Sequence, residues 1–283
     1  MTFFIFNVLI QKHMKKIILL FTLLFSFFSC KKETDFLVKY DFKYAPDSLN
    51  KTKIVSEEMI LSTNNQGYVY MSNGLFKSDT IGNLTDLVKQ GKLSFSDFMN
   101  QKGQDSQNIK LYFNKDSNAY HIHTSIDGLS YKFKDDVTKL TWELVDEEKQ
   151  IQNYKAKKAK TKAFGKNWTA WYTEKIPVAY GPYKFQGLPG LILELSDDKN
   201  NFKFDLVEAR IDTTKYPIYE KANEVNSKRI EFENKIKEIK NNPVKITSKT
   251  GDDTVKDKKY LDLRKEEFFK KNNSIEKGLQ FNL

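Results

Sequence analysis

Phe36-Leu37-Val38-Lys39-Tyr40-Asp41-Phe42-Lys43-Tyr44 is the stretch that decides the fold. Its even positions are all apolar or aromatic, and three of the four odd positions between them are charged. Successive side chains of a strand point to opposite faces of a sheet, so this period of two predicts a strand with one buried face. The same period recurs in runs that we predict as further strands, namely 53–62, 67–72, 109–114, 119–125, 130–134, 140–145, 150–160 and 167–173.

The clearest hairpin lies near the end of this series. Leu191 to Ser196 and Phe202 to Ile211 are alternating runs joined by Asp-Asp-Lys-Asn-Asn, residue types that favour turns. Helical spacing of apolar residues predicts two short helices, 83–90 and 94–100. The expected fold class is α+β and mainly β: a curved antiparallel sheet with short helices and a helical C-terminal tail. A half-barrel similar to that of lipoprotein carriers is one form that such a sheet takes.

We expect one β-rich domain over residues 36–219, followed by a charged, partly helical extension over residues 220–283. Ile230, Ile236 and Ile239 are spaced as on one face of a helix, and residues 262–271 are predicted as a second helix. The extension is expected to be appended to the domain, without a core of its own.

The composition excludes several classes of protein. A single cysteine among 283 residues rules out a disulfide framework and cysteine-rich metal modules. The net charge of +10 falls to 44 minus 37, or +7, from Cys30 onward, because three lysines and no acidic residues precede it. A lysine-rich surface of this charge is ordinary for a well-hydrated protein, so we expect no nucleic-acid partner.

The amino terminus predicts export. Residues 1–29 are predicted to be a signal peptide, with Met14 as the true start, because Lys15-Lys16 is followed by an apolar run too short to span a bilayer. Cys30 follows Ser29 as in bacterial lipoprotein signals, and the resemblance implies lipidation of Cys30 and a tether over residues 30–35. The expected location is the bacterial cell envelope, at the outer membrane, with the cell surface as one possible face. An ordinary secreted protein with a free thiol is the alternative.

One segment resembles a known family. Trp168, Trp171, Ile176-Pro177, Gly181-Pro182 and the hexapeptide Gly187-Leu188-Pro189-Gly190-Leu191-Ile192 stand in the order found in the GLPGLI family of Bacteroidota. The likeness extends over roughly Phe36 to Tyr219. The family is defined by sequence and export, and the resemblance implies no particular activity. Ala156 stands where many relatives have a cysteine, so thiol chemistry at that position is excluded here.

The segment between the strands at 167–173 and 191–196 has two interpretations. Its prolines fix φ and lack an N–H donor, so it is predicted to be a stiff crossover, with a structural motif made by Pro177, Gly181, Pro182, Gly187, Leu188, Pro189 and Gly190. In one interpretation it is a structural corner that closes one end of the sheet. In the other it is the rim of an apolar groove, with candidate binding residues Trp168, Trp171, Tyr172, Tyr180, Tyr183 and Phe185.

Other candidate sites are weaker. His121 and His123 lie two apart on a predicted strand, with Asp127 as a third ligand, but a surface-facing or packed strand pair is the preferred interpretation, and we expect no metal and no cofactor. Glu174 and Glu194 are candidate acids for a hydrolase, although nothing in their spacing singles them out. The chain contains no nucleotide-binding loop, serine elbow or HExxH motif, and no catalytic residue is assigned.

Three hypotheses of function remain. The first is a non-enzymatic envelope lipoprotein that binds a hydrophobic or peptide ligand, or a protein partner, while its lipid anchor holds it to the membrane. The second is a hydrolase of an envelope polymer that works through carboxylates. The third is a scaffold that tethers partners at the membrane.

Overall fold

The computed structural model describes residues 34–47, 52–80, 90–91, 94, 109–126, 129–212, 224–241 and 274–276. Asp35–Leu283 forms one compact unit. Cys30, Asp127, the predicted signal peptide and the helix predicted at 262–271 lie outside the described residues. So do the helices predicted at 83–90 and 94–100, except for Gln90 and Ser94.

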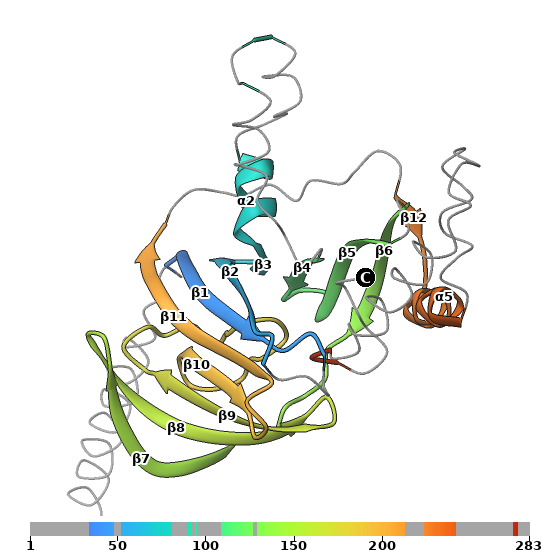
Figure 1. The fold of residues 1–283 in the computed structure, drawn as a ribbon. Helices are drawn as coiled ribbons and strands as arrows, with labels where there is room; N and C mark the ends of the chain where they lie inside the picture. The colour runs from blue at the N-terminus through green and yellow to red at the C-terminus, as the bar shows by residue number, and fades with distance from the viewer. Residues whose placement is uncertain are drawn as a thin grey trace, which may run out of the picture. The chain divides into compact units, whose positions relative to one another are not determined.

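One large sheet dominates the unit, and the predicted mainly β fold is confirmed (Figure 1). Its twelve strands are ordered β12-β6-β5-β4-β3-β2-β1-β11-β10-β9-β8-β7 and pair antiparallel, except that β12 runs parallel to β6. The strands are β1 (Phe36–Tyr44), β2 (Val55–Asn64), β3 (Gly67–Ser72), β4 (Ile109–Asn114), β5 (Ala119–Ile126), β6 (Leu129–Asp136), β7 (Glu143–Ile151), β8 (Tyr154–Ala163), β9 (Lys166–Thr173), β10 (Leu191–Asp197), β11 (Phe202–Ile211) and β12 (Val225–Asn226).

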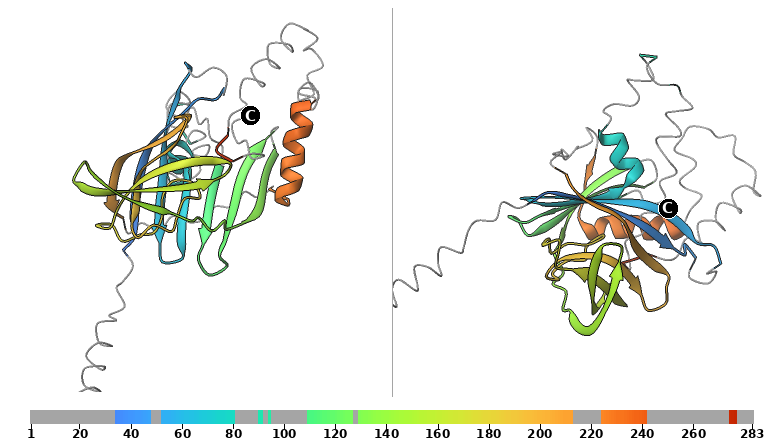
Figure 2. Two further views of the ribbon diagram at one scale, coloured as in Figure 1. Left: turned by 90° about the horizontal axis from the view of Figure 1, so that it is seen from below. Right: turned by 90° about the vertical axis from the view of Figure 1, so that its left-hand side faces the viewer.

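The sheet is strongly curved because of one short connection. β6 and β7 lie toward opposite ends of the strand order, yet only residues 137–142 join them. A fully extended chain covers at most about 3.6 Å per residue, so this connection spans roughly 25 Å or less. The sheet must therefore bend back on itself, as Figure 2 shows, and it does so without closing into a barrel.

The concave face holds the core. Alternate residues of the strands point into it, which is why the period-two pattern of β1 predicted its buried face correctly: Val38, Tyr40, Phe42 and Tyr44 all lie in the main core cluster. Many of the largest buried side chains are aromatic, and Phe42 stacks on Phe204 with ring centroids 4.3 Å apart.

The prediction of one strand over residues 150–160 was wrong at its start. Gln150 and Ile151 complete β7, and the chain turns at Gln152 and Asn153 before β8 begins. Gln152 adopts a φ of 48°, in the left-handed region that such turns use. The turn contains no glycine or proline, and its one turn-forming residue type, Asn153, was overlooked.

Two helices, α2 (Asn73–Thr80) and α5 (Arg229–Asn241), occur among the described residues. α2 covers the convex face, where Leu75 and Phe76 pack on a small cluster from β3 and β4. α5 buries Phe232, Ile236 and Ile239 in the main core, so this part of the predicted extension is integral to the domain core. No helix of the described part of the chain is long and apolar enough to cross a membrane.

Candidate functional site

Residues 174–190, which we call the crossover, pack into the concave face of the sheet. Two buried tyrosines of the sheet donate hydrogen bonds from their hydroxyls to backbone carbonyls of the crossover: Tyr68 to Tyr183 at 2.8 Å and Tyr120 to Lys184 at 3.2 Å. A third, Tyr40, donates to the carbonyl of Ile192 at 2.7 Å, at the start of β10. Burial raises the pKa of Tyr40, Tyr68 and Tyr120, which keeps these hydroxyls protonated and able to donate. The crossover is therefore fixed by hydrogen bonds as well as by apolar contacts.

The six aromatic residues predicted to line a groove do not form one. Four of them, Trp168, Tyr172, Tyr183 and Phe185, are buried, and Trp168 lies against Phe185 with ring centroids 4.7 Å apart. Trp171 and Tyr180 are partly buried. The groove-rim interpretation fails for the four buried residues, because their side chains fill the concavity, and the geometry favours the structural corner.

The predicted structural motif packs as a corner. Gly187 adopts a φ of 97°, which L-residues rarely adopt. A Cβ at Gly190 would lie 2.0 Å from the backbone oxygen of Thr173, so no side chain fits there. Leu188 is buried and Pro189 is exposed. The remaining motif residues, Gly181 and Pro182, are buried, and Pro177 is exposed.

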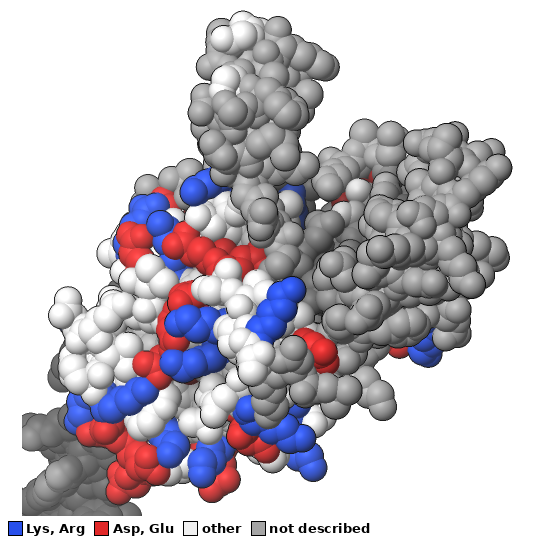
Figure 3. Space-filling model, viewed as in Figure 1, with Lys and Arg blue, Asp and Glu red and all other residues white. Residues whose placement is uncertain are grey.

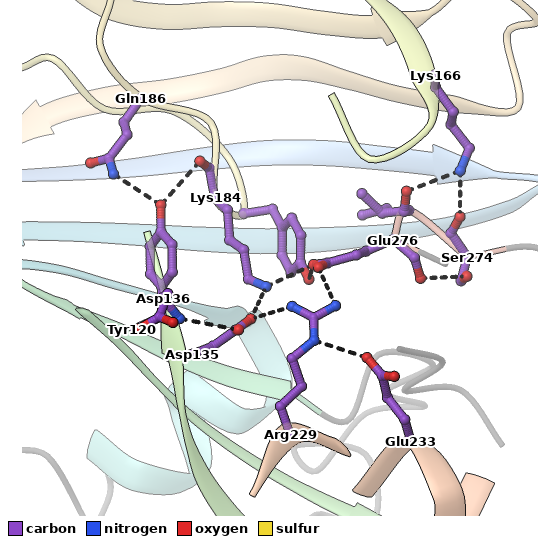
Figure 4. A network of polar contacts seen from close by, with 12 residues as sticks. Tyr120, Asp135, Asp136, Lys166, Lys184, Gln186, Arg229, Glu233, Ser274 and Glu276 are labelled. Carbon is purple, nitrogen blue, oxygen red and sulfur yellow. Dashed lines mark hydrogen bonds and ion pairs between the residues drawn. The ribbon is translucent and has the colours of Figure 1, made fainter. Parts of the chain in front are cut away.

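Beside the crossover lies a buried cluster of charges (Figure 4). We call it the carboxylate clamp: Tyr183, Lys184 and Arg229, which together hold the carboxylate of Glu276. Glu276 Oε2 accepts hydrogen bonds from the Tyr183 hydroxyl at 2.9 Å and from Lys184 Nζ at 2.7 Å. Its other oxygen, Oε1, lies 2.5 Å from Arg229 Nη2. Both carboxylate oxygens are thus bound by cationic donors.

Acidic residues of the sheet and of α5 orient the two cations of the clamp. Asp135 Oδ2, on β6, accepts hydrogen bonds from Lys184 Nζ at 2.6 Å and Arg229 Nη1 at 2.7 Å. Arg229 Nε donates to Glu233 Oε1, one helical turn along α5, at 2.9 Å. Charge-assisted hydrogen bonds of this kind are the strong ones, and they fix the planar guanidinium toward Glu276.

Tyr183 and Lys184 are held in place by local backbone geometry. Tyr183 adopts a φ of 57°, which is uncommon for a residue other than glycine. The hydrogen bond from Tyr68 to its carbonyl stabilises this conformation, which turns the Tyr183 side chain toward Glu276. Lys184 Nζ lies 5.6 Å from the ring centroid of Tyr120 and 5.2 Å from that of Tyr183, so aromatic faces also surround the ammonium.

A third cation holds the backbone next to Glu276. Lys166 Nζ, at the start of β9, donates hydrogen bonds to the carbonyl of Ser274 at 2.8 Å and to that of Ile275 at 2.9 Å (Figure 4). Ile275 packs against the main core, and the Ser274 hydroxyl donates to the Glu276 carbonyl at 2.8 Å. The segment Ser274–Glu276 is therefore bound through two backbone carbonyls and one carboxylate.

The electrostatics of the clamp follow from burial and pairing. Burial alone would raise the pKa of Asp135, but the adjacent Lys184 and Arg229 outweigh it and lower that pKa below its ordinary value. Burial and the neighbouring Glu276 raise the pKa of Tyr183 well above its ordinary range. Burial lowers the pKa of Lys166. At neutral pH Tyr183 consequently remains a donor and Asp135 remains an acceptor.

The two histidines of β5 lie in different surroundings. His123 is buried, its Nδ1 lies 2.9 Å from Glu224 Oε2, and its ring meets that of Tyr112 edge-on at 5.2 Å. His121 is exposed on the same strand. The described residues contain no group of three or more His, Cys, Asp or Glu that could hold a metal ion.

The two candidate acids are paired with lysines of β8 and β7. Glu174 Oε1 accepts a hydrogen bond from Lys157 Nζ at 2.9 Å, and Glu194 pairs with Lys149. Lys149 also lies over the ring of Trp171, with its Nζ 4.5 Å from the centroid. Acidic and basic side chains alternate in this way over the described surface in Figure 3.

Sequence reasoning found Tyr183 but missed the other members of the site: Asp135, Lys166, Lys184, Arg229, Glu233 and Glu276. One signal was available for Arg229. Only three of the 47 basic residues are arginines, and arginine is the residue suited to buried carboxylates. A lysine between Tyr183 and Phe185 was a second signal, because its aromatic neighbours in a stiff crossover predict burial.

Comparisons with known proteins give two alignments with solved structures and one match to a family model. A structure of PNGF-II in space group P21 aligns with a TM-score of 0.48 and 15% identity, covering 71% of this chain and 32% of that one. A second PNGF-II structure, in space group C2, aligns with a TM-score of 0.44 and 15% identity, covering 69% and 31%. The chain thus spans about a third of the length of these structures. No curated protein matches the chain.

Residues 163–194 match the model of a family described as a protein of unknown function (Porph_ging). The match runs from the last residue of β8 through β9 and the crossover into β10. It therefore covers Lys166, Tyr183 and Lys184, three of the residues that bind the segment Ser274–Glu276, within a family whose function is not known.

Proposed function

We propose that this chain is an exported, lipid-anchored binding module of the GLPGLI type, which holds a peptide segment of a protein partner on the concave side of its sheet. The observation that supports this proposal is the way in which Lys166, Tyr183, Lys184 and Arg229 converge on a short stretch of chain. They bind two backbone carbonyls and one carboxylate, which are groups that every acidic peptide presents.

Among the ligands considered, the geometry favours a peptide over a hydrophobic molecule. Four of the six aromatic side chains expected to form an apolar groove are buried in the core. The donors of the clamp are charged, and a hydrophobic molecule would leave them without acceptors, at a cost of several kcal/mol in a buried site.

The hydrolase alternative has less support. The candidate acids Glu174 and Glu194 each pair with a lysine, and the Glu174 carboxylate is about half exposed. A catalytic acid of a glycosidase instead needs surroundings that favour its protonated form. The membrane scaffold is the second alternative, and it predicts that no defined peptide binds.

A peptide array tests the proposal. The chain from Lys31 to Leu283 is applied to immobilised eight-residue peptides of varied sequence, as wild type and with Glu276→Gln, which releases the clamp from its own carboxylate. We expect a subset of peptides to bind one or both proteins. Adding Arg229→Gln should weaken that binding at least tenfold, because the guanidinium that faces the ligand is lost.

Lys149→Gln is the matched control, because it removes one positive charge from the surface away from the clamp. Arg229→Lys, which keeps the charge but not the planar fork, replaces Arg229→Gln if that variant fails to fold by circular dichroism. Absence of any peptide binding, or equal binding by the Arg229 and Lys149 variants, would overturn the proposal.

A further inference from the structure

We infer that the clamp selects a glutamate within a short peptide segment, and that Ser274–Glu276 is its built-in ligand, which an equivalent segment of a partner must displace. This inference rests on the proposed function. It adds the class of peptide that binds and the segment of the same chain that competes with that peptide. The ligand class is a peptide with an apolar residue directly before a glutamate, as in Ile275-Glu276.

Charge balance supports selection of an acidic side chain. Apart from Glu276, the site brings together three cations, Lys166, Lys184 and Arg229, and two anions, Asp135 and Glu233. One further carboxylate makes the cluster neutral. Since the side chains of Lys184 and Asp135 are only 3% and 8% exposed, water screens this balance weakly, and a neutral glutamine in place of the glutamate would leave a buried positive charge.

The spacing between the anchors supports glutamate over aspartate. Lys166 holds the carbonyls of Ser274 and Ile275, while Tyr183, Lys184 and Arg229 hold the end of the side chain that follows. Lys166 belongs to β9, whereas the donors to the carboxylate come from the crossover and from α5. Aspartate is one methylene shorter, so its carboxylate cannot reach all three donors while the backbone stays on Lys166.

The contacts that hold Ser274–Glu276 are of a kind that allows a partner segment to replace it. Ser274–Glu276 is held mainly by polar and ionic contacts, with Ile275 partly buried as its apolar contact. Buried ion pairs contribute little net stability, because desolvation offsets the attraction. A partner segment that makes the same contacts therefore replaces it at little cost, apart from the high effective concentration of a segment in the same chain.

Fluorescence anisotropy with a labelled peptide tests the inference. The probe is a fluorescein-labelled peptide of residues 270–280, Lys-Lys-Asn-Asn-Ser-Ile-Glu-Lys-Gly-Leu-Gln. The protein is the chain from Lys31 to Leu283. We expect the peptide to bind Glu276→Gln at least tenfold more tightly than wild type, because the built-in ligand is weakened. Peptides with glutamine or aspartate in place of the glutamate should bind that variant at least tenfold more weakly.

Two further variants make the result specific. Glu238→Gln removes the same charge from α5 at an exposed position and should bind the peptide no better than wild type does. Glu276→Gln combined with Arg229→Gln should lose the gain. If Glu276→Gln does not fold, Glu276→Asp serves instead, since its shorter side chain also vacates the clamp.

The outcomes separate the two proposals. Equal affinity of the Glu276 and Glu238 variants for the peptide would overturn the built-in ligand, and equal affinity for the glutamate and glutamine peptides would overturn the selectivity. If Arg229-dependent binding to the peptide array persists in either case, the proposed function stands without this inference. If array binding is absent as well, both fail.

Discussion

Gly190 shows how a single missing side chain builds the corner before β10. Its Cα faces the end of β9, where a Cβ would approach the Thr173 backbone oxygen to 2.0 Å. A Cβ at Gly187 would have space, because the nearest atom would lie 3.9 Å from it. Glycine is needed at this position because the backbone adopts a positive φ. The two glycines of the hexapeptide are thus needed for different physical reasons.

This difference predicts a graded effect on stability. Gly190→Ala should lower the free energy of unfolding by about 3 kcal/mol or more, because the backbone of β9 or β10 must move. Gly187→Ala should cost about 1–2 kcal/mol through backbone strain alone. Urea unfolding followed by tryptophan fluorescence measures both, and equal effects of the two substitutions would contradict this account.

Asp135 gives the clamp a pH dependence. Its pKa is lowered in the folded protein, so its contribution to stability is present above the ordinary value of about 3.9 and is lost as the pH falls through the folded value. Asp135→Asn should therefore lower the free energy of unfolding by about 3 kcal/mol at pH 7, and by progressively less below about pH 4.

The adjacent Asp136 provides the comparison for this measurement. It is exposed on the same strand, so Asp136→Asn should change stability by about 0.5 kcal/mol or less at either pH. Denaturant unfolding at pH 7 and pH 3.5 decides the matter. A cost of Asp135→Asn that stays constant with pH would show that its ion pairs with Lys184 and Arg229 contribute nothing.

At the scale of elements, α5 is the part of the C-terminal region that belongs to the core. Phe232 is buried with its ring 5.2 Å from that of Phe133 and 5.5 Å from that of Tyr131, both on β6. The predicted helix face named Ile230, but that residue is 55% exposed. The other two residues of the predicted face, Ile236 and Ile239, are buried in the core, and Phe232 is buried beside them.

We predict that Phe232→Ala lowers the free energy of unfolding by about 3–5 kcal/mol, because it leaves a cavity between α5 and β6. It should also increase amide hydrogen exchange along α5, as the helix separates from the sheet more often. Ile230→Ala, on the exposed side of the same helix, should change neither quantity. Mass-detected hydrogen exchange measures the effect, and unchanged protection of α5 in the Phe232 variant would contradict the prediction.

The elements show what the sequence predicts well. Alternation is a local signal, so β3, β4 and β11 begin and end at the predicted residues. The β7–β8 turn contains a single residue type that marks turns, Asn153, and its position depends on how the two strands pair. The clamp was missed for a related reason: the charges of the clamp, its ligand Glu276 and the neighbouring Asp135 lie at positions 135, 184, 229 and 276, and only the completed sheet brings them together.

At the scale of the whole molecule, the predicted attachment to the membrane depends on Cys30. If Cys30 is acylated, Cys30→Ser should move the protein from the membrane fraction to the soluble fraction of the producing bacterium, since two or more acyl chains are what hold a lipoprotein stably. Fractionation with metabolic labelling by radioactive palmitate measures this. Retention of the serine variant in the membrane fraction, or labelling that does not depend on Cys30, would contradict the prediction.

The place of β1 in the strand order determines how the chain reaches its native state. β1 to β6 follow one another as neighbours, and so do β7 to β11, but the two series meet where β1 pairs with β11, joining Phe36 to Ile211. Closing so long a loop carries an entropic cost and slows folding. During synthesis, β1 has no partner on one side until residue 211 has been made. Each nascent molecule thus passes through a period with an open strand edge at its centre, when it is most vulnerable to aggregation.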